Sequence, residues 1–393
     1  MLVLFVDYLM SLWHIPGIRL LKYVTSRSVF VAVLAIIIAI YGCKKIIIYF
    51  NKRGIKDEVR GLNLPGQFQK NVPSMGGIVI VVSTIILTVL FADITNIYID
   101  ILLITTIMMG ILGFCDDYIK LYKHNKNGLS AKTRLLVQTI LGSIIGIIMV
   151  FHPDVYVKKK TYIDNSKTIE TNKLVTSVPF FKNNEINYCK IFSFAGRWYI
   201  VLFILLMTFI IVGTSNAVNL TDGLDGLAVG LSIIVLAVLC VFAYISGHYD
   251  IATYLNIFYI PNFSEVSIFC SALIASCIGF LWYNSYPAQI FMGDTGSLVL
   301  GGNISVLAII TRKELLLPLL CGVFVIETLS DILQVAYFKY TKKKYGAGRR
   351  IFLMAPIHHH FQKMNIQEPK IVARFLIVGI VLGIITLATI KIQ

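Results

Sequence analysis

Residues 97–120 read IYIDILLITTIMMGILGFCDDYIK, an apolar run that ends in two adjacent acidic residues and a lysine. Its first part, 97–114, has the length of about 17 to 25 residues that a helix needs to cross the hydrocarbon core of a bilayer. Backbone polar groups cannot stay unpaired in lipid, so such a run must be helical. The stretch therefore predicts a membrane-spanning helix with Asp116 and Asp117 at its end.

The whole chain has the composition of a membrane protein. Of its 393 residues, 57% are hydrophobic and 14% are charged, whereas a soluble domain carries about 25% charged residues. The formal net charge of +15 is spread through apolar sequence. It forms no basic stripe on a soluble module, which argues against nucleic-acid binding. In a membrane protein such an excess sets the topology and meets anionic head groups or phosphates.

Ten apolar segments predict an all-α polytopic membrane protein in which residues 1–393 form one membrane-embedded domain. The expected spans are 28–50, 75–93, 97–114, 134–151, 198–217, 226–246, 267–284, 296–311, 314–337 and 371–391. The connections on one side are 51–74, 115–133, 218–225, 285–295 and 338–370. This side receives 21 of the 35 Lys and Arg residues, so the positive-inside rule makes it cytoplasmic. On the other side, 152–197 alternates polar and β-prone residues and predicts a small β-hairpin.

Four groups of unusual polar residues all fall on the predicted cytoplasmic side. They are Asp116 with Asp117, Asp222 with Asp225, Asp294, and the run His358, His359 and His360. Ionisable residues at membrane ends are costly and usually functional. Two adjacent carboxylates are able to hold a divalent ion or to act as a base against a phosphate.

Each group also has a structural interpretation. Asp116 and Asp117 could cap a helix end or pair with Lys120, although an acid at the carboxyl end of a helix is disfavoured by the helix dipole. An ordinary Asp-Gly turn would explain one Asp-Gly pair in 218–225, but not two with Asn216 and Asn219 beside them.

The histidine run is open to two chemical interpretations. Consecutive histidines on one helix point in different directions, and zinc ligands usually need wider spacing, so hydrogen bonding to a phosphate or diphosphate is favoured over a zinc site. Lys70, Lys120 and Lys132 flank the carboxylate loops, and a diphosphate needs cationic partners in such a place. Acids, cations and glycine turns at one membrane face therefore indicate phosphoryl transfer with Mg²⁺ on a lipid-linked substrate.

At these residues the chain resembles the polyprenyl-phosphate N-acetylhexosamine-1-phosphate transferases, and within them the muramoyl branch. The matching stretches cover every predicted cytoplasmic loop, and ten spans is the architecture of that family. They are Pro73–Gly77, Gly113–Lys120, Gly128–Lys132, Ser215–Ala228, Phe280–Asn284, Pro287–Gln289, Phe291–Leu298 and Met354–Phe361. The run His358–His360 separates the muramoyl branch from the N-acetylglucosamine branch.

The resemblance implies UDP-N-acetylmuramoyl-pentapeptide and undecaprenyl phosphate as substrates, lipid I and UMP as products, and Mg²⁺ as cofactor. It also implies a homodimer in the bacterial cytoplasmic membrane with its active site on the cytoplasmic face. By this analogy Asp294 is the metal ligand, Asp116 the base or the nucleophile, and Asp117 its support. The residues implied to bind the substrates are Lys70, Lys120, Lys132, Asn216, Asn219, Asp222, Asp225, Asn284, Phe291, Gln334, His358, His359 and His360.

The sequence departs from the family pattern in a few places. Ser74 stands where Thr is common, and Gln362 stands where Glu is usual beside the histidines. Two alternatives to a lipid I synthase are a transferase for N-acetylglucosamine-1-phosphate, against which the histidine run argues, and an ion-coupled transporter. Transporters place their charges near the membrane midplane in broken helices, whereas these charges cluster at loop ends.

Overall fold

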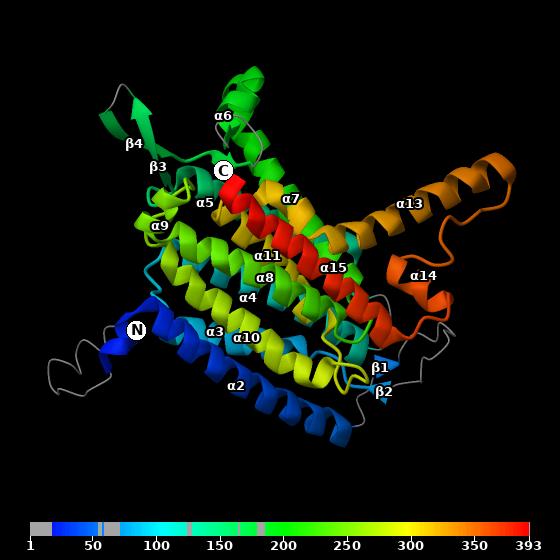
Figure 1. The fold of residues 1–393 in the computed structure, drawn as a ribbon. Coiled ribbons are helices and arrows are strands. Elements are labelled where there is room, and N and C mark those ends of the chain that lie inside the picture. Colours follow the sequence, from blue (N-terminus) through cyan, green and yellow to red (C-terminus); the bar gives the residue numbers. More distant parts are fainter. Residues whose placement is uncertain are drawn as a thin grey trace.

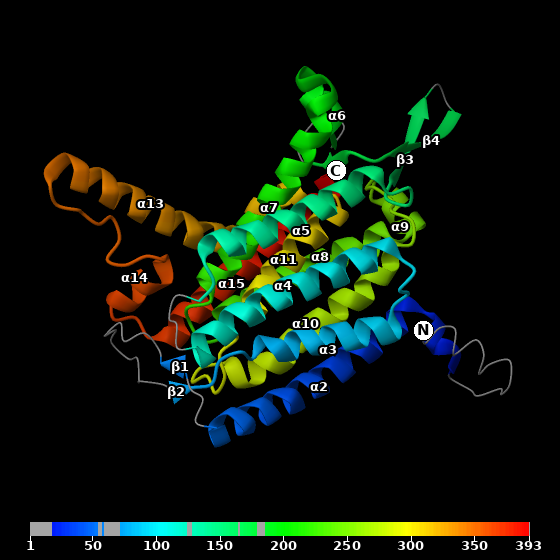
Figure 2. The ribbon, with the colours of Figure 1, turned by 180° about the vertical axis from the view of Figure 1, so that it is seen from behind.

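The computed structural model describes residues 18–53, 57–58, 71–123, 128–163, 166–178 and 185–392. Within these ranges the chain is a bundle of long helices, and Figures 1 and 2 show most of them running alongside one another. Eight are long and apolar enough to cross a membrane, and one bent pair makes a ninth. The eight are α2 (Val24–Arg53), α4 (Ile97–Tyr122), α5 (Ala131–Phe151), α7 (Tyr199–Thr221), α8 (Leu227–Ser246), α10 (Val266–Asn284), α11 (Gly293–Ile310) and α15 (Glu368–Ala388).

The ten expected spans each coincide with helical structure, so the predicted fold class is confirmed. The span expected at 75–93 is the shorter apolar helix α3 (Gly77–Phe91). The span expected at 314–337 is not one straight helix. It is a 3-10 turn, η4 (Glu314–Leu316), with α12 (Leu317–Leu320), followed by α13 (Gly322–Tyr345) after a bend of 77°.

Helix α13 leaves the bundle at this bend. It continues eight residues beyond the expected end of the span and stops where Gly346 adopts a left-handed conformation, with φ 74°. Figures 1 and 2 show its outer end standing away from the other helices. The short helix α14 (Ile357–Lys363) lies between α13 and α15 and carries the three histidines. The predicted loop 338–370 is therefore largely helical.

Capping residues define the helix starts that position the site. Asn96 accepts a hydrogen bond from the Tyr98 amide at the start of α4, and Ser130 accepts one from the Thr133 amide at the start of α5. Helix α4 does not end at residue 114 as expected but runs on to Tyr122, so Asp116 and Asp117 lie inside its last turns. Their side chains are paired there, as described below, so they do not interrupt the helix.

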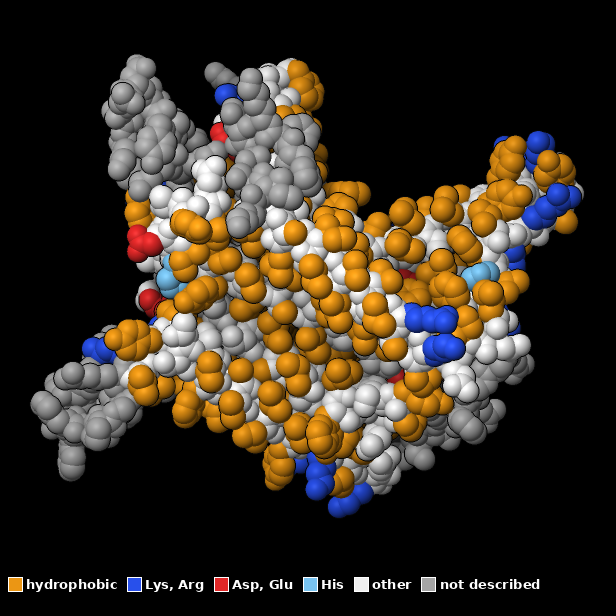
Figure 3. All heavy atoms as spheres, in the orientation of Figure 1, with side chains coloured by type: hydrophobic (Ala, Val, Ile, Leu, Met, Phe, Trp, Pro, Cys, Tyr) orange, Lys and Arg blue, Asp and Glu red, His pale blue; other side chains and the backbone are white. Residues whose placement is uncertain are grey.

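Helix α11 forms the centre of the bundle. It packs against α3, α4, α7 and α8, and every residue from Thr295 to Ile310 is buried. Helices α2 and α15 are the most exposed of the long helices. Figure 3 shows apolar side chains over the flank of the bundle and basic ones gathered at the outer end of α13. An exposed apolar band of this kind is expected of a surface that faces lipid.

The predicted β-hairpin is also present. Strands β3 (Val157–Ile163) and β4 (Ser166–Asn172) pair antiparallel, as do β5 (Val175–Ser177) and β6 (Glu185–Asn187). A third two-stranded ladder joins β1 (Asp57–Glu58) to β2 (Asn71–Val72). The pair β3–β4 lies at the end of the bundle opposite α14 (Figure 1).

Candidate active site

The site is built where the last turns of α4 meet the first turn of α11. Gly113 allows this approach because a Cβ there would lie only 2.4 Å from the Asp294 carbonyl oxygen. One turn later Asp117 receives three hydrogen bonds from the start of α11: the Asp294 amide at 2.9 Å, the Thr295 amide at 2.9 Å and the Thr295 hydroxyl at 2.6 Å. Asp117 thus caps a helix far from it in sequence and fixes where Asp294 stands.

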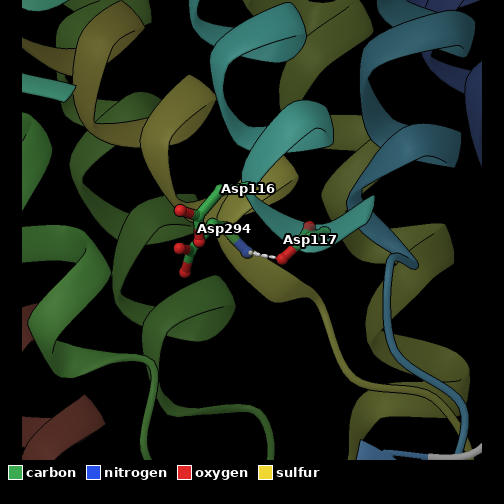
Figure 4. A group of neighbouring side chains, drawn as sticks. All are labelled: Asp116, Asp117 and Asp294. Carbon is green, nitrogen blue, oxygen red and sulfur yellow. Dashed lines mark hydrogen bonds between the residues drawn. The ribbon is translucent and has the colours of Figure 1, made fainter. Parts of the chain in front are cut away.

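Asp116 and Asp294 face each other on the other side of this junction. Figure 4 shows their carboxylates gathered together, whereas the Asp117 carboxylate points to the Asp294 amide. Lys120 bridges the pair, with Nζ 2.5 Å from Asp116 Oδ2 and 2.7 Å from Asp294 Oδ2. Asn219 donates to Asp294 Oδ1 at 2.7 Å, and the Leu129 amide donates to Asp116 Oδ1 at 2.7 Å.

The donor set suits a hard divalent cation. Among the described residues, Asp116, Asp117 and Asp294 bring carboxylate oxygens within 4.8 Å of one another, and Mg²⁺ prefers oxygen ligands of this kind. Asp116 is fully buried, and the side chain of Asp294 is only 15% exposed. Asp117 already accepts three hydrogen bonds, so Asp116 and Asp294 are the residues best placed to hold a metal.

The turn after α7 brings further carboxylates to the same place. Asp222 is partly buried. Its pKa is raised to about 8 by removal from water and by the negative charges of Asp294, Asp117 and Asp225. Asp225 has a structural contact as well, because its carboxylate accepts a hydrogen bond from the Ala288 amide at 2.8 Å.

Three predicted substrate-binding residues make hydrogen bonds within the protein. Asn216 donates to Gln138 Oε1 at 2.8 Å. Asn284 accepts from the Gly226 amide and donates to the Ile290 carbonyl at 2.9 Å, so it ties two loops together. Gln334 accepts from the amides of residues 351 and 352 and donates to the Phe352 carbonyl, which holds the loop after α13 against that helix.

The histidines approach the turn 218–225 from α14. His358 is 1% exposed, and its Nδ1 lies 2.9 Å from Glu327 of α13. Its Nε2 is buried without a hydrogen-bond partner in the described part of the chain, and it comes so close to Gly223 that a side chain there would overlap it. The close approach of His358 to Gly223 therefore places the histidine run beside the turn that carries Asp222 and Asp225.

The other two histidines have different surroundings. His359 Nδ1 lies 2.7 Å from the Gln362 amide oxygen, so the residue that departs from the family pattern contacts the histidine run directly. Burial, and then the neighbouring His358, lowers the pKa of His359 to about 4. His360 Nδ1 accepts from the Leu353 amide at 3.1 Å.

The remaining predicted residues are placed less centrally. Lys132 is exposed in the first turn of α5, and Lys70 lies outside the described residues. The backbone of Phe291 joins it to the stretch 73–77: it donates to the Pro73 carbonyl at 2.8 Å and accepts from the Gly76 amide at 2.9 Å.

Sequence reasoning missed several residues that complete the site. Arg134 lies 3.7 Å from Asp294, Ser297 accepts from Asn219 at 2.8 Å, and Glu368 accepts from the Asp225 amide at 2.8 Å. Glu327 carried a usable signal, since it is an acid inside the mostly apolar run 314–337, and such a residue is a functional candidate.

Comparisons with known proteins bear on this arrangement. A family model described as "Glycosyl transferase family 4" matches residues 99–312, a range that holds Asp116, Asp117 and Asp294. A phospho-N-acetylmuramoyl-pentapeptide-transferase of Amoebophilus asiaticus is 49% identical over the full length of both chains. Proteins of the same name from Flavobacterium psychrophilum and Parabacteroides distasonis are 44% and 45% identical; the first alignment covers both chains completely, and the second covers 96% of this chain and 97% of the relative.

The chain belongs to the phospho-N-acetylmuramoyl-pentapeptide-transferase family. The resemblance to the muramoyl branch is thereby confirmed, and this transferase is a multi-pass membrane enzyme. The family model ends before α14, but the full-length relatives also cover the histidine run.

Proposed function

We propose that this transferase moves phospho-N-acetylmuramoyl-pentapeptide from UDP to undecaprenyl phosphate, which gives lipid I and UMP for peptidoglycan synthesis. The observation that carries the proposal is the meeting of Asp116 of α4 with Asp294 of α11, with Lys120 between them, in a chain of this family. The donor is soluble and the acceptor is a membrane lipid. An enzyme that brings them together needs a charged site at the membrane end of its helices.

Mg²⁺ is proposed as the cofactor, with Asp294 as its ligand. When bound, it would neutralise negative charge on the diphosphate of the donor. Asp222 lies close to the same carboxylates, and removal from water, together with their negative charges, raises its pKa. Asn219 holds Asp294 in place through its hydrogen bond.

The reaction is a displacement at phosphorus. An oxygen of the lipid phosphate attacks the β-phosphorus of the donor, the bridge to the α-phosphate breaks, and UMP leaves. Asp116 takes any proton that remains on the lipid phosphate. Lys120 and Arg134 lie beside Asp294, where they stabilise the charge that develops on the transferred phosphoryl group.

The proposed setting is the bacterial cytoplasmic membrane, with the site on the cytoplasmic face. The excess of basic residues on the side of the site supports this orientation. The family resemblance also leads us to propose that the protein acts as a homodimer.

The test is UMP release by the purified protein with UDP-N-acetylmuramoyl-pentapeptide, undecaprenyl phosphate and Mg²⁺. UDP-N-acetylglucosamine serves as the second donor, and release is expected with the muramoyl donor alone. Asp294→Asn should lower the rate by about 100- to 1,000-fold, the range for loss of one charge-stabilising group. Asp250→Asn is the matched control, because Asp250 is an exposed acid in α9 (Tyr249–Tyr254) away from the site. Release with UDP-N-acetylglucosamine instead would move the enzyme to the sister branch, and no release with either donor would sink the proposal.

A further inference from the structure

A separate cavity lies in the angle between α13, α14 and α15. Its volume is about 290 Å³, and apart from Arg374 its lining is apolar. Val323 and Ile326 of α13, Phe361 of α14, and Phe375 and Val378 of α15 form much of the wall. This volume is just below the range of about 300 to 1,000 Å³ that is usual for ligand pockets.

The cavity opens onto the apolar flank of the bundle. Its floor is buried, since Val323 is 4% and Ile371 is 1% exposed, whereas Ile326 and Val378 at its rim are 48% and 46% exposed. A cavity with a buried apolar floor and a mouth among lipid-facing side chains is reached from the membrane. The chemistry of the lining suits a hydrocarbon chain.

Arg374 gives the cavity its charge. It is the charged residue of the lining, it is exposed, and no ion pair with a carboxylate of the described chain is found for it. Lys370 is exposed one turn earlier on α15. Basic pockets between membrane helices on the cytoplasmic side are sites for anionic lipid head groups.

The occupant is not the lipid substrate in its reacting position. None of Asp116, Asp117, Asp294 and Asn219 lines the cavity, so a phosphate held at Arg374 would not stand at the reacting centre. The volume also suits a stretch of one chain better than a long polyprenyl group.

We propose that this cavity binds one acyl chain of an anionic phospholipid of the surrounding membrane, with the lipid phosphate at Arg374. The bound chain packs against Phe361 and Ile357, which flank the three histidines, and against Ile326, the neighbour of Glu327. It therefore braces the pair of helices that carries the His358–Glu327 contact. The lipid acts as a structural ligand of the site and is not consumed.

The test is native mass spectrometry of the detergent-solubilised protein, titrated with phosphatidylglycerol and, separately, with phosphatidylcholine. Wild type should retain one phosphatidylglycerol more tightly than phosphatidylcholine. Arg374→Gln should weaken its retention by about fivefold, as expected for one basic residue at a lipid surface. Val378→Trp should abolish it by filling the mouth of the cavity. Lys339→Gln, which removes an exposed charge from α13 outside the cavity, should leave it unchanged.

Two outcomes would overturn the proposal. Equal retention by wild type and Arg374→Gln, both with unaltered thermal unfolding, would show that the cavity holds no anionic lipid. Displacement of phosphatidylglycerol by undecaprenyl phosphate, with a raised KM for that substrate in Arg374→Gln, would assign the cavity to the lipid substrate. The binding measurement needs no turnover, so its failure is distinct from a failure of the proposed function, on which only the KM comparison rests.

Discussion

Asp116 and Asp117 are neighbours in sequence but have different roles. Successive residues of a helix are turned by about 100° around its axis, so Asp116 faces Lys120 and Asp294 while Asp117 faces the amides of α11. One carboxylate belongs to the reacting centre, and the other positions it.

Asp117→Asn should therefore affect folding as well as activity. An amide keeps only one acceptor oxygen, so part of the cap on α11 is lost, at a cost of about 1 kcal/mol, and the thermal midpoint should fall. Asp116→Asn should lower UMP release by about 100-fold or more while leaving the cap on α11 intact. Thermal unfolding in detergent beside the activity assay checks both. If Asp117→Asn unfolds at the wild-type temperature, the capping role of Asp117 is wrong.

At the residue scale, the sequence predicts which residues lie at the site but not which hydrogen-bond partner each of them has. The carboxylates, Lys120 and Asn219 could be named because acids at membrane ends and paired Asp-Gly turns are unusual. Asn284 and Gln334 were named by resemblance as donor-binding residues, and their hydrogen bonds to backbone groups could not be predicted from the sequence. Glycine contacts and amide partners depend on segments far apart in the chain, which no local pattern reveals.

The approach of α4 to α11 depends on glycine, and this can be tested at the scale of the two helices. In Gly113→Ala the new Cβ would meet backbone atoms of Asp294 and Thr295 at 2.4 and 2.5 Å. Backbone cannot swing aside, so the helices must separate, and a displacement of about 1 Å in a catalytic site can cost about 100-fold in rate. Gly213→Ala in α7 is the control, because a Cβ there has nothing within 4 Å. Equal UMP release by both variants would contradict the proposed close contact.

The turn between α11 and α12 is buried under the strand pair β5–β6. Lys313 is 3% exposed and donates to Ser177 at 2.6 Å. Burial lowers its pKa from 10.5 to about 7, and Glu314 opposes the shift. Between these two values the unfolded chain binds more protons than the folded one, so stability rises with pH in that window and is constant below it. A short turn at a membrane end gives no sign in sequence of this burial.

The lowered pKa of Lys313 predicts that stability depends on pH through a residue away from the active site. The thermal midpoint of the wild type should rise between about pH 7 and pH 9, whereas Lys313→Met, which has no charge to lose, should show a smaller rise. Differential scanning fluorimetry in one detergent at matched ionic strength measures both slopes. Parallel slopes would mean that Lys313 keeps its charge in the folded protein.

For the whole molecule, hydropathy and charge along the sequence were enough to predict the ten spans. They also predicted the common face of the polar groups and the external hairpin. The bend of 77° before α13 was not predicted, although Pro318 and Gly322 lie on either side of it, because 314–337 has the length of one span. The bend points the outer end of α13 away from the bundle and opens the angle in which α14 and the cavity lie. The geometry around the histidines is thus decided by packing between elements, not by local composition.

The orientation of the whole molecule can be read from its own cysteines. Cys189 is exposed beside β6, at the end opposite the site, and Lys343 is exposed at the outer end of α13. In spheroplasts, a membrane-impermeant maleimide should label Cys189 and should reach a Lys343→Cys variant at position 343 only after permeabilisation. The Cys115→Ser background removes the exposed cysteine nearest the carboxylates, and Cys189→Ser is the control for the external signal. The reverse pattern would place Asp116 and Asp294 on the outer face, away from any nucleotide-sugar made in the cytoplasm, and would reject the proposed orientation.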